Sequence, residues 1–97
     1  MVSAGGGLAG MIGADPDQLI HLGTTLARQR EVVDGIVSLV STHLANTLWS
    51  GPARQTFESE WQSSFRVALT RLGEAFDMAG RDCQARANEL RRVMGVG

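Results

Sequence analysis

The feature that most constrains this 97-residue sequence is a break at its centre. Apolar residues recur at spacings of three and four as far as Trp49, and the same spacing resumes at Ala53. Between them stand Ser50, Gly51 and Pro52. Glycine accepts backbone dihedrals that a side chain forbids, and proline ends one helix and starts the next. The break predicts two helices joined by a turn at residues 49–52, and so short a connection makes the helices antiparallel neighbours.

The first helix is expected over residues 15–48. Asp15 is a good N-cap residue, Pro16 suits the first helical position, and Gln18 stands where a capping box has Glu or Gln. The apolar residues of this helix fall within one broad arc, and Gly23 lies near that arc, where it would let the helices approach closely. Residues 1–14 are rich in glycine, and we expect them to form a flexible tail.

The second helix is expected over residues 53–94, with an apolar stripe about 120° wide. Phe57, Trp61, Phe65 and Phe76 span about 100° of this stripe, because successive helical residues turn by about 100°. These four rings therefore cannot all face the first helix. Burying a side chain of this size stabilises a fold by roughly 1.5–3 kcal/mol. We expect an all-α, antiparallel two-helix hairpin that dimerises into a four-helix bundle.

The candidates for the dimer interface are the larger apolar residues of the two stripes. They are Leu26, Val33, Val40, Phe57, Trp61, Phe65, Leu69, Leu72 and Phe76. Arg54 and Glu58 lie four residues apart at the edge of the second stripe, where they form a stabilising surface pair or set the register of a partner.

Composition and charge argue against several classes of function. The formal net charge is −1 and the isoelectric point about 6.0, whereas a nucleic-acid binder carries a basic face. The polar sides of both helices mix acidic and basic residues, which disfavours a membrane-lytic helix, and the apolar runs are too short to span a bilayer. The first residues lack the basic segment of a cleaved signal peptide.

No catalytic residue, cofactor site or metal site is expected. His21 and His43 lie far apart on the first helix, without the clustered ligands that a metal needs. Cys83 lies in the apolar stripe with no histidine in the same helix, which is typical of a small core residue rather than a nucleophile. As the single cysteine, it forms no internal disulfide.

With these features the chain resembles the small Trp-x-Gly (WXG) proteins, which are substrates of type VII secretion in actinobacteria and firmicutes. The length and the placement of the helices agree over nearly the whole chain. The resemblance implies a hairpin that forms an antiparallel four-helix bundle, either as a homodimer or with a second family member. It also implies export from the cytoplasm in folded form, without a cleaved signal peptide. The residues that carry the resemblance are Trp49, Ser50, Gly51, Ala53, Phe57 and Trp61.

In that family the export signal is composite. The Trp-x-Gly turn of one chain lies beside a Tyr-x-x-x-Asp/Glu motif of its partner, and the secretion ATPase reads that end of the bundle. Trp49, Ser50 and Gly51 are therefore the candidate turn and secretion motif. The sequence has no Tyr, so a heterodimer with a chain that supplies the missing motif is expected in preference to a homodimer. The alternative is a cytosolic adaptor that escorts a larger type VII effector with a similar helical domain and is not itself exported.

Overall fold

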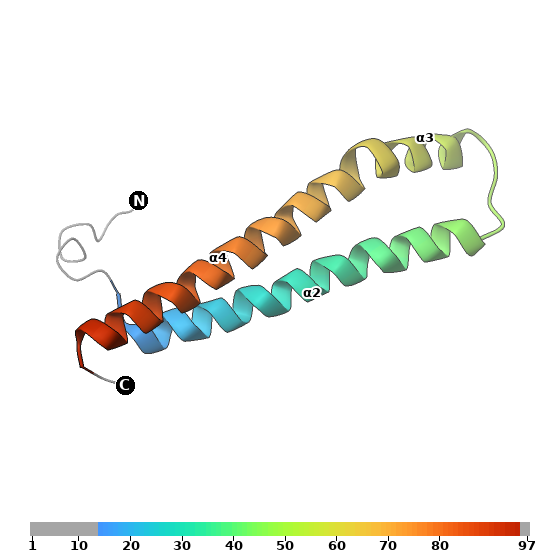
Figure 1. Ribbon diagram of the computed structural model, residues 1–97. Helices are drawn as coiled ribbons and strands as arrows, with labels where there is room; N and C mark the ends of the chain where they lie inside the picture. Colours follow the sequence, from blue (N-terminus) through green and yellow to red (C-terminus); the bar gives the residue numbers. More distant parts are fainter. Residues whose placement is uncertain (1–13, 96–97) are drawn as a thin grey trace.

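The computed structural model describes residues 14–95, which form a helical hairpin (Figure 1). One arm is α2 (Pro16–Asn46). The other arm is one nearly continuous rod made of α3 (Pro52–Glu60), the π-helical turn η1 (Trp61–Phe65) and α4 (Arg66–Val93). The described residues form helices and turns and contain no strand. The predicted all-helical hairpin is confirmed.

The two helical arms begin at the residues that favour helix starts. The carboxylate of Asp15 accepts hydrogen bonds from the backbone amides of Asp17 (2.8 Å) and Gln18 (3.4 Å), and Pro16 opens α2. Gln18 takes part through its backbone rather than its side chain. Pro52 opens α3 in the same way. The flexible tail expected over residues 1–14 lies outside the described residues, apart from Ala14.

The segment between the arms is longer than the predicted turn. α2 ends at Asn46 rather than near residue 48, and residues 47–51 form an extended loop before α3. Gly51 has a φ of 114° and a ψ of 179°, a backbone region that is open almost only to glycine. The reversal of the chain therefore depends on Gly51, as the sequence indicates.

The arms lie closest near the end opposite the turn and diverge toward it (Figure 1). At the close approach, a Cβ atom added to Gly23 would lie 3.0 Å from the carbonyl oxygen of Gly80, and one added to Gly80 would lie 3.2 Å from the carbonyl oxygen of Gly23. The absence of a side chain at each glycine thus leaves room for the backbone of the other helix. This is the close helix approach that the position of Gly23 predicts.

The core of the hairpin is small. Trp61 is its largest member, 3% exposed, and its indole N–H donates to Ser41 Oγ at 3.1 Å. Cys83 is buried with a free thiol, as expected of a small core residue. No large side chain of the described residues is completely enclosed. The buried apolar residues are Val33, Leu44, Trp61, Cys83 and Ala87.

The π-helical turn corrects one expectation about the aromatic stripe. In an uninterrupted α-helix, Trp61 would be rotated about the helix axis by about 100° from the small residues Gly73 and Gly80, which face α2. A π-turn adds one residue without advancing the helix by the usual angle, so α3 is rotated as a unit. This rotation brings Trp61 onto the side that faces α2. The sequence pattern assumes a regular helix and therefore overestimates how far the rings spread.

Candidate interaction site

The turn displays two large apolar side chains at the end of the hairpin. Leu48 is fully exposed, with a relative accessibility of 103%, and nearly half of Trp49 is exposed. The Trp49 ring packs against Phe57 at a centroid distance of 6.5 Å. Ser50 is exposed and Gly51 half-buried, so the predicted Trp-Ser-Gly motif lies at an accessible end of the molecule.

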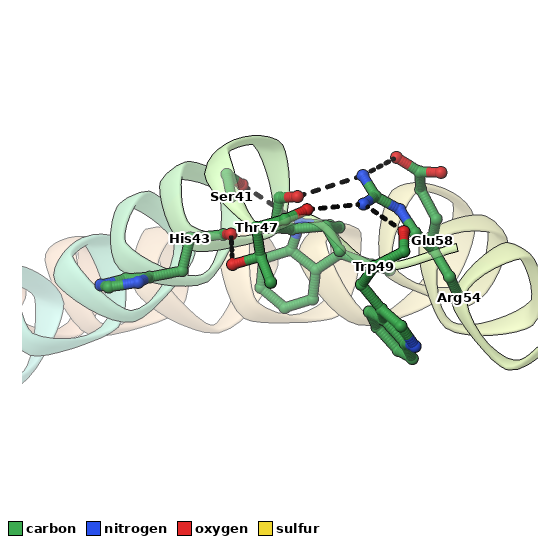
Figure 2. A network of polar contacts seen from close by, with 8 residues as sticks. Ser41, His43, Thr47, Trp49, Arg54 and Glu58 are labelled. Atoms are coloured by element: carbon green, nitrogen blue, oxygen red, sulfur yellow. Dashed lines mark hydrogen bonds and ion pairs between the residues drawn. The ribbon is translucent and has the colours of Figure 1, made fainter. Parts of the chain in front are cut away.

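Arg54 forms the polar framework behind this turn (Figure 2). Its guanidinium donates to the carbonyl oxygens of Leu44 (3.1 Å), Thr47 (3.1 Å) and Trp49 (2.9 Å). It also pairs with Glu58 at 3.4 Å. The predicted pair between Arg54 and Glu58 is therefore present, but most of the hydrogen bonds of Arg54 go to the backbone at the end of α2.

A groove of about 350 Å³ opens beside the turn. Its walls carry no formal charge, and His43 and Thr47 are the polar side chains among the apolar ones. The residues that line the groove are Leu39, Val40, His43, Leu44, Thr47, Trp49 and Phe57.

Phe57 is the centre of an aromatic cluster on this part of the hairpin. Its ring lies 6.2 Å from Trp61, 6.4 Å from Phe65 and 6.5 Å from Trp49, measured between centroids. Trp61 anchors the cluster in the core, whereas about half of Phe65 is exposed. The cluster therefore links the hairpin interior to an accessible aromatic surface.

The two broad faces of the hairpin differ in polarity. On α2, the residue directly before a buried or half-buried one is often large and apolar, as at Val32, Ile36 and Leu39. On α4, the same positions hold Leu72 and several alanines toward the turn, whereas toward the other end they hold Asp82 and Arg86, which pair at 3.7 Å. Both helices are right-handed and they run antiparallel, so positions one step before the buried stripe lie on the same broad face. We call this the apolar face: Leu22, Val32, Ile36, Leu39, His43, Ala68, Leu72, Ala75 and Ala79.

The opposite broad face is polar, and two local ion pairs involve its residues. The residue directly after a buried one is typically polar or charged, and we call this side the charged face: Asp34, Ser38, Ser41, Thr70, Glu74, Asp77, Arg81 and Gln84. Arg30 pairs with Asp34, and Arg81 with Asp77, each at 3.0 Å. By contrast, residues 35–53 contain no Asp, Glu, Lys or Arg. The uncharged surface of the molecule is thus concentrated toward the turn.

The predicted interface residues divide into three groups in the structure. Val33 and Trp61 are buried inside the hairpin, which leaves almost none of their surface for a partner. Leu26, Val40, Phe57, Leu69 and Phe76 are half-buried. Phe65 and Leu72 are exposed, with accessibilities of 47% and 43%.

The sequence pattern passes over several exposed apolar residues that form part of the accessible surface. Val32 and Leu39 lie off the apolar stripe of the first helix, and that displacement is the signal that they serve a second face. The sequence pattern places Leu48 at the end of the apolar stripe of the first helix, whereas in the structure it lies in the loop after α2 and is exposed. The bonds from Arg54 to the end of α2 and the loop are also missed, because the spacing to Glu58 accounts for Arg54 without reference to these carbonyl groups.

Metal-ligand clusters and membrane-spanning helices are both absent from the part of the chain that the structure describes. Residues 14–95 contain no group of three His, Cys, Asp or Glu side chains that could share a metal ion. Among the described helices, none is both long and apolar enough to cross a bilayer.

Comparison with known proteins adds no relative. No family model, curated protein or solved structure matches the chain. Function is therefore inferred from the turn and the apolar face.

Proposed function

We propose that this chain is a non-enzymatic helical-hairpin subunit of a type VII secretion system and forms half of a four-helix bundle. The observation that carries the proposal is the uncovered apolar face opposite a charged face. A second hairpin laid on the apolar face would bury the exposed side chains of both helices, at about 25 cal/mol per Å² of apolar surface. The charged face would remain in water, where its ion pairs need no partner.

The partner in this proposal is another hairpin of the Trp-x-Gly family. The last part of α2, residues 35–46, carries no charge, so a partner that covers it presents an uncharged surface there. The sequence has no Tyr for the second half of the composite export signal. A different chain that contributes this motif is therefore favoured over a second copy, and the secretion ATPase would be reached through that chain.

The turn is the proposed recognition element of the exported pair. Leu48 and Trp49 stand in the loop beyond the end of α2. In this proposal the partner lies along the helices and leaves the loop accessible. The Gly51 backbone directs the chain back into α3 and so keeps both side chains at that end. Such a pair would leave the cytoplasm folded and without cleavage of a signal peptide.

A second candidate function is that of a cytosolic adaptor. The absence of Tyr favours it, because a chain without the motif need not be an export substrate. In this case the apolar face would hold a helical domain of a larger type VII effector. The two functions differ in outcome: the adaptor stays in the cell when its partner is exported, whereas the subunit appears in the medium with it.

The test combines mass measurement with an export assay. The chain is co-expressed with the Trp-x-Gly protein of the neighbouring gene, and light scattering should give the mass of a one-to-one complex. Trp49→Ala should leave that mass unchanged, because Trp49 lies in the loop outside the apolar face, but should abolish appearance of the pair in the culture medium. A 10.4 kDa particle that stays solitary with its neighbour, or normal export of the Trp49 variant, would contradict the proposal.

A further inference from the structure

The structure assigns Arg54 as the residue that positions the recognition turn. Its guanidinium supplies the hydrogen-bond donors that the end of α2 lacks, and so fixes the loop that displays Leu48 and Trp49. This inference rests on the proposed function of the turn, but its physical basis is a property of the single chain.

The end of α2 has no cap of its own in the backbone. A helix leaves its last four carbonyl groups without intrahelical donors. The usual solution is a glycine of positive φ whose amide folds back, and α4 ends that way: Met94 N donates to Leu90 O at 2.9 Å and Gly95, with a φ of 75°, donates to Arg92 O at 3.2 Å. After α2 the next residue, Thr47, is extended instead, with a φ of −99° and a ψ of 131°.

Arg54 provides a side-chain cap from the following helix. One terminal nitrogen reaches the carbonyl oxygens of Thr47 and Trp49, and the other reaches that of Leu44 and the carboxylate of Glu58 (Figure 2). The Thr47 hydroxyl adds a bond to the carbonyl oxygen of His43. A cation near a helix C-terminus is also stabilised by the helix dipole. The Arg54 side chain is only 19% exposed, so these bonds are partly shielded from water.

The bonds fix the loop on both sides of Leu48. The carbonyl groups of Thr47 and Trp49 flank this residue, and the same guanidinium nitrogen holds both. Figure 2 shows the Trp49 ring directed away from the guanidinium, and the ring packs on Phe57 instead. The backbone of the displayed residues is therefore held from one side, while on the other side Leu48 stays fully exposed and the Trp49 ring lies on Phe57.

The planar fork of arginine is essential to this arrangement. A lysine ammonium at the same position keeps the charge, but as a compact point on a flexible stem it does not span three carbonyl groups and a carboxylate. Arg54→Lys therefore separates positioning from charge. Arg86→Lys is the matched control, since Arg86 makes an exposed pair with Asp82 at 3.7 Å within α4, far from the turn.

The first experiment measures backbone order parameters by NMR in the isolated chain. We expect order parameters of about 0.85 for residues 47–51 in the native protein, and order parameters below about 0.6 in Arg54→Lys and Arg54→Gln. Arg86→Lys should leave them unchanged, and the amides of α4 should serve as the internal reference in every variant. Unchanged order in the loop of both Arg54 variants would overturn the inference.

The second experiment measures export of the same variants with the native partner. Arg54→Lys should reduce export about tenfold or more, the loss expected when one charge-assisted hydrogen bond no longer holds the displayed loop, while the complex keeps its mass and its cellular level. A loosened loop with full export would show that Arg54 does not control display and would overturn the inference. Normal export of Trp49→Ala, in contrast, would remove the proposed function and leave the loop measurement standing.

Discussion

At the residue scale, two glycines set the distance between the arms. Gly23 and Gly80 stand opposite each other, and each carbonyl oxygen occupies the space that a Cβ atom on the other would need. A glycine inside a helix costs roughly 0.5–1 kcal/mol relative to alanine. Packing explains why glycines stand at this contact, because a wider separation of the arms would expose the small core near Cys83 and Ala87.

This reasoning predicts opposite effects for two glycine substitutions in α2. Gly23→Ala places a methyl group 3.0 Å from a backbone oxygen, so the arms must move apart, and we expect a net loss of about 1–2 kcal/mol in the free energy of unfolding. Gly35→Ala meets nothing within 4 Å and should gain about 0.5–1 kcal/mol. Urea titration of both variants and of the native protein measures these changes in the free energy of unfolding. A stabilised Gly23→Ala would show that the contact is not tight.

At the element scale, the second arm depends on the π-turn. The five residues of η1 separate α3 from α4 and set the rotation that turns Trp61 toward α2. A π-turn is equivalent to one residue inserted into an α-helix. The indole N–H bond to Ser41 exists because of this rotation, since Ser41 lies on the other arm.

Deletion of one residue therefore has a position-dependent effect. Removing Ser64 from η1 should restore a regular α-helix with Trp61 still facing α2, so the variant should keep its helix content and unfold within a few degrees of the native protein. Removing Thr70 from α4 should rotate α3 and η1 by about 100° and expose Trp61, with a loss of about 3–5 kcal/mol. Both residues are exposed and polar, which makes the pair a matched comparison. Circular dichroism measures the helix content and the unfolding of each variant, and the emission maximum of tryptophan reports the exposure of Trp61. Equal losses of stability in the two deletions would contradict the view that the π-turn acts as one inserted residue.

At the scale of the whole molecule, local signals predicted the hairpin well and its surface less well. Asp15, Pro16, Gly51 and Pro52 act within a few residues of the chain, so the helix starts and the reversal could be anticipated. The π-turn and the cap by Arg54 arise from contacts between segments that a periodic pattern treats separately. The same limitation assigned Trp61 to an outer surface, whereas the rotated helix encloses it.

The apolar face could be read from the sequence only once the buried stripe was known. Val32 and Leu39 look like imperfections when one stripe is assumed, because a single helix pair needs only one. In the structure they lie one position before the residues that face α4, on the side where the other helix also presents apolar residues. Two adjacent apolar stripes on each helix are typical of a bundle with more than two helices.

The last prediction tests the apolar face by comparing two neighbouring residues of α2. Leu39, 61% exposed, lies on the apolar face, and Ser38 lies on the charged face. Neither contributes to the core of the hairpin, so Leu39→Glu and Ser38→Glu should both leave the helix content and the unfolding temperature of the isolated chain nearly unchanged. A glutamate at Leu39 would be desolvated by a partner, whereas one at Ser38 would stay in water.

Binding to the partner chain should therefore discriminate between the two variants. We expect Leu39→Glu to weaken the complex by at least about 2 kcal/mol, or roughly thirtyfold in the dissociation constant, and Ser38→Glu to change it by less than about threefold. Sedimentation velocity of mixtures at several concentrations measures both constants under one condition. Because the two glutamates carry the same charge and stand one residue apart, equal weakening would mean that charge alone acts, and a selective effect of Ser38→Glu would place the partner on the opposite face.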